Sequence, residues 1–361
     1  MKIKYYLNFK EENRLSMDEF AQQLLSYQTE NYKEHEISYF LPKLSIFSKL
    51  MVIKKFQLRH ARYFSYPGQI KKLPLHDISH ICDQQYGHLY SSLNSKVKII
   101  TVNDLVPIVL QKQIGRKPYL IQYSLSKLKY YDKVVAISET TKNDILQYTD
   151  CPEEKIEVLL RVEDPFFDNT PINENKICDF YDLPKKKIKI LIEGNIFYKN
   201  NETAFKTLRE LLKINKNVIF VKIGGKSDLT KFEDLKDKVY DLPFIKKQKL
   251  SDIYKICKIF FVPTIHTGGS LPIIESMKCG TPIVCSNTGS FLEIVKNTAL
   301  TCDPFDVNSF VKNISNFLDN NDLYLKKKNE ALERSKFFSL STYHKNLIEI
   351  YENELSKKNN T

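Results

Sequence analysis

The chain has 361 residues, 42% of them hydrophobic and 27% charged, which excludes disordered, collagen-like and coiled-coil classes and predicts about two domains. No apolar run approaches the roughly 18 residues that a membrane-spanning helix needs. The net charge of +12 rests on lysine, since only seven of the 55 basic residues are arginine. Nucleic-acid recognition favours arginine in clustered patches, so no nucleic-acid partner is expected, whereas the lysines suit a weak contact with an anionic membrane surface.

The first half alternates strand-like and helix-like segments. We expect strands at 4–9, 77–82, 97–102, 133–137 and 156–160, and helices at 16–27, 86–93 and 139–148. Ser138 is placed to cap the last of these helices. Residues 40–75 carry three prolines and no clear period, which predicts irregular structure. Residues 164–175 are polar and contain two prolines, which is typical of a linker.

A second α/β series follows the predicted linker. Strands are expected at 187–192, 217–223, 259–262 and 281–285, and helices at 202–213, 250–257, 271–278, 291–296, 307–318, 322–336 and 341–356. Repeated short β–α units predict parallel sheets covered by helices. The sequence therefore predicts an α/β protein with two Rossmann-like domains.

Glycine is concentrated at the ends of predicted strands in the second half. Of the ten glycines, seven lie there: Gly194, Gly224, Gly225, Gly268, Gly269, Gly280 and Gly289. A single turn glycine is explained by backbone geometry. Several of them after neighbouring parallel strands favour a ligand site, because ligands bind at the carboxyl edge of such sheets.

Residues 263–282 combine a strand end, a glycine loop and a helix start. Ser270 can cap the helix, and Pro272 suits its first turn, where a missing N–H is harmless. The free amides at this helix start, which suit an anion such as a diphosphate, belong to Gly269, Ser270 and Leu271. Glu275, one turn further on, suits the vicinal hydroxyls of a ribose; the alternative is that it stabilises the helix dipole.

This segment resembles the signature E-G-F-G-L-P-x-x-E-A-M-x-x-G-x-P of glycosyltransferase family 4, whose members have the GT-B fold. The matching residues are Gly268, Leu271, Pro272, Glu275, Gly280 and Pro282. Residues 193–200 resemble the family's glycine turn with a phosphate-binding lysine, here Lys199, and residues 222–225 its next strand end. The resemblance covers roughly residues 77–355 and is more specific in the second half.

The sequence departs from the family pattern at four places. Thr267 replaces the first glutamate of the signature, and Asn195 replaces the arginine after the glycine turn. Residues 11–16 replace an N-terminal Gly-Gly loop, and Asn103-Asp104 replaces a His-Asp pair. Lys199 is thereby left as the main side-chain cation for a diphosphate.

The resemblance implies a GT-B architecture of two Rossmann-like domains facing a cleft. Residues 1–165 would form the acceptor domain and residues 166–340 the nucleotide-sugar donor domain. Residues 341–361 would form a C-terminal helix that packs back on the first domain. The implied function is retaining transfer of a hexose from a nucleotide-diphospho-sugar to a glycan or lipid-linked acceptor, in bacterial surface polysaccharide or lipopolysaccharide biosynthesis.

The resemblance also implies a metal-independent enzyme without a cofactor, and the chain holds no Asp-x-Asp for a divalent metal. The implied donor-binding residues are Gly194, Asn195, Lys199, Gly224, Gly225, His266, Thr267, Gly268, Gly269, Ser270, Leu271 and Glu275. On the acceptor side, Asp83, His88 and Asn103 follow predicted strands, although His88 also fits an ordinary helix-facing histidine. We expect catalysis to involve Lys199, Glu275, Asn103 and Asp104, with no metal ligands.

Three other classes of function are alternatives to glycosyl transfer. A GT-B protein weakened in catalysis would bind a nucleotide sugar or glycan without turnover, and Thr267 and Asn103 are its best support. A nucleotide-sugar epimerase or a phosphorylase is a further GT-B alternative. A Rossmann dehydrogenase is disfavoured, because no Gly-x-Gly-x-x-Gly follows the first strand.

The cysteines and the N-terminus bear on the compartment. The seven cysteines are scattered without a Cys-x-x-Cys pair, which predicts reduced thiols buried as small hydrophobes. The first residues carry charges and no cleavage site, so no signal peptide is expected. These features favour the cytoplasm, peripheral to the inner face of the plasma membrane where the acceptor is membrane-bound.

Overall fold

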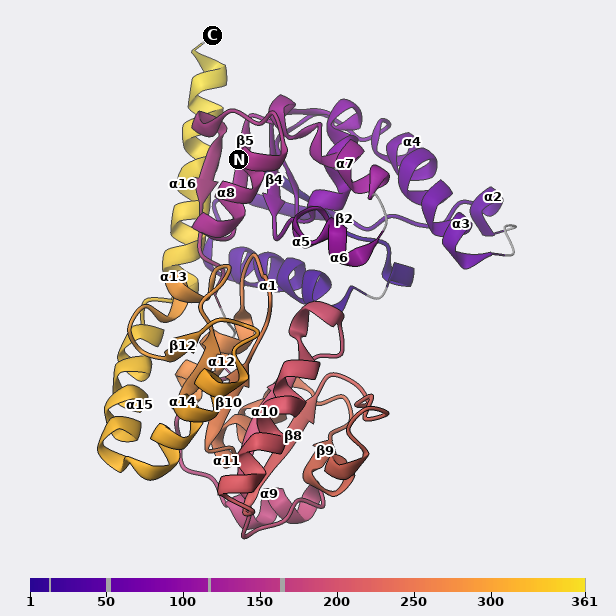
Figure 1. The fold of residues 1–361 in the computed structure, drawn as a ribbon. Helices are drawn as coiled ribbons and strands as arrows, with labels where there is room; N and C mark the ends of the chain where they lie inside the picture. Colours follow the sequence, from indigo (N-terminus) through magenta and orange to yellow (C-terminus); the bar gives the residue numbers. More distant parts are fainter. Residues whose placement is uncertain (13, 50–52, 116–117, 163–165, 361) are drawn as a thin grey trace. The chain divides into compact units, whose positions relative to one another are not determined.

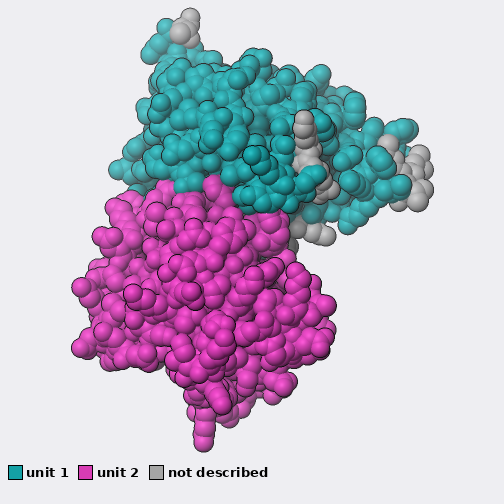
Figure 2. Space-filling model, in the orientation of Figure 1, with its two compact units in different colours: residues 1–160, 341–361 teal, residues 161–340 magenta. Residues whose placement is uncertain are grey.

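The computed structural model describes every residue except 13, 50–52, 116–117, 163–165 and 361 (Figure 1). The chain divides into two compact units, coloured separately in Figure 2. Unit 1 comprises Met1–Leu160 with Ser341–Thr361, and unit 2 comprises Arg161–Leu340. Residue 165, the expected end of the first domain, lies outside the described residues.

Unit 1 is built on six parallel strands in the order β2-β1-β3-β4-β5-β6. They are β1 (Lys2–Tyr6), β2 (Glu36–Phe40), β3 (His76–Ile81), β4 (Ser95–Val102), β5 (Lys133–Ala136) and β6 (Ile156–Val158). The sequence analysis missed β2, an edge strand with no fully buried residue. Because all six strands are parallel, their carboxyl ends meet at one edge.

The helices of unit 1 connect and cover these strands. They are α1 (Leu15–Asn31), α2 (Ile46–Lys49), α3 (Lys54–His60), α4 (Tyr66–Ile70), α5 (Val106–Val109), α6 (Gln111–Ile114), α7 (Tyr119–Leu125), α8 (Glu139–Tyr148) and α16 (Leu340–Asn359). The predicted cap of α8 is confirmed, since the Ser138 hydroxyl accepts a hydrogen bond of 2.9 Å from the Thr141 amide. The expected helix at 86–93 is instead the 3₁₀ helix η3 (Gln84–Ser92).

The prediction of irregular structure across 40–75 was wrong. From Lys54 to Ile70 the chain is continuously helical, through α3, a π-helical turn at Ala61–Ser65 and α4. Its buried residues Ala61, Tyr66 and Ile70 are spaced five and four apart. The π turn adds a residue to the repeat, so the 3.6-residue period that signals a helix is lost.

Helix α16, yellow in Figure 1, belongs to unit 1. A buried polar network attaches it to the sheet of that unit. Tyr351 on α16 has no exposed surface, and its hydroxyl lies 2.9 Å from that of Tyr5 and within hydrogen-bond distance of His80 Nδ1. His344, about two turns earlier on the same helix, stacks on Tyr27 with ring centroids 4.2 Å apart. The C-terminal helix thus belongs to the core of the first Rossmann-like unit.

This network makes the stability of unit 1 sensitive to acid. Burial lowers the pKa of His80 to about 3 and that of His344 to about 4. Both are neutral when folded, whereas the unfolded chain binds their protons below about pH 6.5. Stability is therefore complete above pH 6.5, and each histidine removes about 1.4 kcal/mol per pH unit as the pH falls toward its folded pKa.

We expect His344→Phe to lower this acid sensitivity, because phenylalanine keeps the stacking on Tyr27 and binds no proton. Thermal unfolding from pH 7.5 to pH 5 would show a smaller fall in Tm for the variant than for the unmodified chain. An equal fall in both proteins would contradict the role given to His344.

Unit 2 has a second sheet of six parallel strands, in the order β12-β11-β10-β7-β8-β9. They are β7 (Ile188–Glu193), β8 (Val218–Ile223), β9 (Val239–Asp241), β10 (Ile259–Val262), β11 (Ile283–Ser286) and β12 (Leu300–Cys302). Its helices are α9 (Glu174–Phe180), α10 (Asn201–Ile214), α11 (Lys247–Ile256), α12 (Leu271–Cys279), α13 (Phe291–Val295), α14 (Val307–Asp319) and α15 (Asn321–Ser335). The two sheets with their covering helices confirm the predicted α/β class with two Rossmann-like units.

The sequence analysis missed the two edge strands β9 and β12, which have only three residues each. Helix α9 begins inside the expected linker, capped by Asn173.

All seven cysteines are free thiols, six of them buried. No helix in the described part of the chain combines the length and the apolar character needed to cross a membrane.

Candidate functional site

Three loops meet at the carboxyl edge of the unit 2 sheet. They follow β7, β8 and β10, which are neighbours in the order β10-β7-β8. A Cβ on Gly224 would lie 3.1 Å from Gly194 Cα, so the first two turns touch. The Ile265 amide donates to the Tyr198 carbonyl at 2.8 Å, which joins the loop after β10 to the turn after β7. The segments predicted to bind a donor therefore converge.

The turn after β7 is shaped by Gly194 and Asn200. Gly194 has a φ of +74°, and a Cβ there would lie 2.8 Å from Lys199 Cγ. Lys199 thus folds directly across Gly194, where only a glycine leaves room. Asn200, itself at a φ of +59°, donates to the Pro263 carbonyl at 3.0 Å and to the Pro304 carbonyl at 2.7 Å.

Lys199 has an acidic partner that the sequence analysis did not consider. Its ammonium group is ion-paired with Glu193, the last residue of β7, and the two side chains are only 19% and 11% exposed. Asn195, in the place of the family's arginine, donates to the Lys226 carbonyl at 2.8 Å. An arriving anion would therefore compete with Glu193 for the lysine.

The N-terminus of α12 has the features of an anion site. Ser270 is its N-cap residue but makes no side-chain capping bond, and Pro272 lies in the first turn as predicted. The Ser270 hydroxyl is buried and has no hydrogen-bond partner among the described atoms. A buried unpaired hydroxyl is costly, and at a helix N-terminus it is available, with the free amides, to an anionic ligand.

Thr267 stabilises the loop in which it lies. Its hydroxyl donates to the Gly269 carbonyl at 2.6 Å, and its carbonyl accepts from the Ser290 amide at 3.2 Å. Gly289 makes this packing possible, because a Cβ there would lie 2.7 Å from the Thr267 carbonyl oxygen. His266 is half-buried in the same loop, and Gly268 is buried beside it.

Glu275 is enclosed within unit 2. Only 4% of its surface is exposed, and its carboxylate accepts a 2.7 Å hydrogen bond from the Tyr254 hydroxyl of α11. Burial and the neighbouring carboxylate raise the pKa of Tyr254 well above its usual value, so the phenol stays protonated and donates. Helix α11 thus orients the carboxylate predicted to bind a ribose.

In unit 1, Asp83 and the two residues after β4 maintain local structure. Asp83 is fully buried, ion-paired with Arg14, and caps η3 by accepting from the Gln85 amide at 2.9 Å. Asn103 is buried and donates to the Cys82 carbonyl at 3.1 Å. Asp104 accepts from the Val106 amide at the start of α5. The sequence analysis did not anticipate these contacts, and those of Asp83 with Arg14 and of Asn103 with Cys82 join separate segments of the chain.

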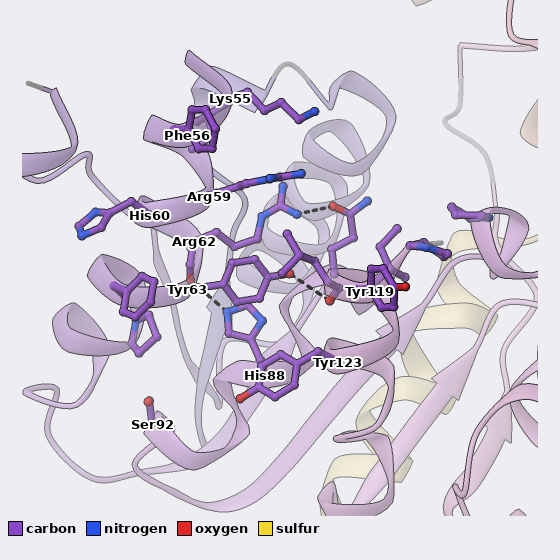
Figure 3. A pocket seen from close by; sticks show the side chains of 18 of the residues that line it. Lys55, Phe56, Arg59, His60, Arg62, Tyr63, His88, Ser92, Tyr119 and Tyr123 are labelled. Atoms are coloured by element: carbon purple, nitrogen blue, oxygen red, sulfur yellow. Dashed lines mark hydrogen bonds between the residues drawn. The ribbon is translucent and has the colours of Figure 1, made fainter. Parts of the chain in front are cut away.

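His88 instead lines a cavity of about 1390 Å³ within unit 1 (Figure 3). Its ring nitrogens lie 3.1 Å from the Ser124 hydroxyl and 3.0 Å from the Arg62 carbonyl. Burial lowers its pKa to about 4, so it is neutral at physiological pH. The sequence analysis did not find this cavity, since its walls come from the helices around the π turn and from α7.

The described residues include no cluster of three or more His, Cys, Asp or Glu side chains arranged to hold a metal ion. Positive charge at the unit 2 site comes from Lys199 and from the amides at the start of α12.

Comparison with known proteins shows a similarity that lies within unit 2. Residues 173–334 match the family described as "Glycosyl transferases group 1". The chain is 26% identical over 259 residues to the serotype-specific mannosyltransferase WbdA of Escherichia coli, covering 67% of this chain and 31% of that protein. It spans 19%, 31% and 48% of the lengths of the first three curated relatives that it matches.

Solved structures share the fold of the whole chain. Sucrose-phosphate synthase from Thermosynechococcus elongatus superposes with a TM-score of 0.80 at 14% identity, over 99% of this chain and 100% of that one. Anabaena Alr3699/HepE, crystallised with UDP and glucose, superposes with a TM-score of 0.77 at 12% identity, over 98% of this chain and 100% of that one.

Proposed function

We propose that this chain, which has the GT-B fold and whose residues 173–334 match the family described as "Glycosyl transferases group 1", transfers a hexose from a nucleotide-diphospho-sugar. The acceptor is a glycan or a lipid-linked glycan, and the pathway is the biosynthesis of a bacterial surface polysaccharide. The observation that carries this proposal is the convergence of Lys199 and the α12 N-terminus at one edge of the unit 2 sheet.

Chemically, the proposed site must stabilise a departing nucleoside diphosphate. Charge that develops on the leaving phosphate needs preorganised donors, and Lys199 and the amides of Gly269, Ser270 and Leu271 would supply them. Glu275, held by Tyr254, would accept from the ribose hydroxyls. The transfer is proposed to retain the sugar's configuration, without a metal ion and without a carboxylate nucleophile from the protein.

Contact of Asn103 and Asp104 with the acceptor stays a prediction. Both lie at the carboxyl edge of the unit 1 sheet, where they follow β4. The proposed place of work is the cytoplasm, peripheral to the inner face of the plasma membrane, where the excess lysine would meet anionic lipid.

The donor is best identified with a thermal-shift panel. UDP, GDP, ADP and CMP, with UDP-glucose and GDP-mannose, would be compared with and without magnesium. The panel includes GDP-mannose because WbdA is named a mannosyltransferase, and it includes UDP because HepE was crystallised with it. We expect one diphosphate to raise the Tm selectively and by the same amount in both conditions.

A shift that requires magnesium would contradict the metal-independent site. No shift with any nucleotide would contradict the proposed donor site as a whole. The sugar-nucleotide that shifts the Tm most would then serve as donor in the transfer assays.

A second candidate is a GT-B protein that binds a nucleotide sugar without transferring it. The observations in its favour are the pairing of Lys199 with Glu193 and the use of the Thr267 hydroxyl within its own loop. Selective nucleotide binding with neither hydrolysis nor transfer of the sugar would favour this candidate.

A further inference from the structure

We propose that the cavity in unit 1 binds a phosphorylated amphiphile, in which a phosphate or diphosphate is joined to a hydrocarbon chain. The binding itself is a property of unit 1 alone. That this amphiphile carries the acceptor sugar rests on the proposed function.

The cavity is positively charged and has no acidic wall. Its described lining includes Lys55, Arg59, Arg62 and Lys71 but no aspartate or glutamate. Arg62 is held by Glu12 at 2.6 Å and by Gln85 at 2.7 Å, so its guanidinium is fixed in place. The other three cations have no ion-pair partner within the described ranges. Such a surface attracts a compact anion.

These cations lie on one wall. Lys55 and Arg59 come from α3 and Arg62 from the π turn that follows, and in Figure 3 their nitrogen ends extend to the same side of that helical segment. The spacing is the reason, because residues four and then three positions apart, as Lys55, Arg59 and Arg62 are, lie on the same face of a helical segment. A phosphate contacted by more than one of these groups gains from charge-assisted hydrogen bonds.

Much of the remaining lining is aromatic and unusually exposed. Phe56 is 54% exposed, Phe64 71%, Tyr119 68% and Tyr123 49%, and all four line the cavity. Exposed bulky apolar side chains gathered in one place mark an interaction site rather than ordinary surface. A free phosphate or a sugar phosphate would leave these side chains in water.

Aromatic rings continue from the rim to the cavity floor. The ring of Tyr63 lies 4.4 Å from that of His88, centroid to centroid, and 6.3 Å from that of Tyr123. Because His88 is neutral, this aromatic surface is uncharged at physiological pH. The volume of about 1390 Å³ exceeds the roughly 300–1,000 Å³ of a typical small-molecule pocket and suits an elongated ligand.

The test measures binding of farnesyl diphosphate to the full-length chain in the absence of nucleotide. Inorganic pyrophosphate supplies the charge alone and farnesol the chain alone. We expect farnesyl diphosphate to bind at least about tenfold more tightly than either, since only it uses both halves of the cavity.

Variants locate the site. Lys55→Gln with Arg59→Gln is expected to weaken farnesyl diphosphate binding by about tenfold or more, which is the scale of one lost charge-assisted hydrogen bond. Lys10→Gln with Lys33→Gln removes two positive charges from exposed positions elsewhere in unit 1 and is expected to leave the affinity within about twofold. Phe56→Ser with Tyr119→Ser should weaken farnesyl diphosphate but not pyrophosphate.

Three results would overturn the proposal. One is equal affinity for pyrophosphate and farnesyl diphosphate. Another is an equal loss of farnesyl diphosphate affinity in Lys55→Gln/Arg59→Gln and in the control Lys10→Gln/Lys33→Gln. The third is binding to phosphatidylglycerol vesicles, lost in Lys55→Gln/Arg59→Gln, without binding of farnesyl diphosphate, which would assign the surface to membrane contact. None of these results depends on the nucleotide panel, so failure of the donor site and failure of this proposal are distinguishable.

Discussion

Replacing Gly289 with alanine is expected to weaken binding of the nucleoside diphosphate by about a hundredfold or more, which corresponds to a loss of about 2.8 kcal/mol in binding free energy. A Cβ at this position would lie 2.7 Å from the carbonyl oxygen and 2.9 Å from the amide nitrogen of Thr267. Both contacts are with backbone, so the loop after β10 must move as a whole. The φ of +57° adds strain that only glycine avoids.

The measurement is titration calorimetry with whichever diphosphate stabilises the unmodified chain. Gly68→Ala serves as the matched control, since a Cβ at Gly68 meets no atom within 4 Å. Circular dichroism would show whether the Gly289 variant remains folded. A folded variant that keeps its affinity would contradict the assignment of the donor phosphates to this loop.

Lys199 and Glu193 are expected to respond to substitution with opposite signs. In Lys199→Met the cation is lost, and the largely buried Glu193 carboxylate is left unpaired where the diphosphate must bind. We expect affinity to fall at least tenfold, about 1.4 kcal/mol or more. In Glu193→Gln the lysine is freed from its partner, and affinity should rise several-fold.

Lys255 and Asp168 form a matched control pair in unit 2. Their ion pair is 2.6 Å long, and the lysine is only 9% exposed. Lys255→Met and Asp168→Asn should alter the Tm but leave nucleotide affinity unchanged. If Lys199→Met and Glu193→Gln move the affinity in the same direction, or not at all, Lys199 is not the phosphate ligand.

The sequence predicted the order of strands and helices in unit 2 closely, because each element there is continuous and flanked by turn residues. Strand β10 has the bounds that its apolar run predicts, and α12 begins after Ser270 and ends at Gly280, whose φ of +69° forms the C-cap. Signals of this kind act within one segment, so they do not depend on which segment packs against it.

Elements that depend on their neighbours were missed. The edge strands β2, β9 and β12 are short or incompletely buried, so they carry little hydrophobic pattern of their own. The helical segment from Lys54 to Ile70 lost its period through the π turn. Its stability comes from tertiary contacts, such as the 2.8 Å hydrogen bond from the Tyr66 hydroxyl to the Leu7 carbonyl.

The candidate site divides in the same way. The sequence by itself determined which loops carry glycine and that they follow parallel strands, and topology then brings them to one edge. Only the tertiary structure decided that Lys199 pairs with Glu193, that Glu275 is held by Tyr254 and that Asp83 is buried against Arg14. The Glu275 and Asp83 contacts join residues far apart in the chain, and the Lys199 contact needs the exact fold of its turn, so spacing alone does not specify them. The cavity of unit 1 is likewise a product of packing, since its walls come from helices that share no sequence motif.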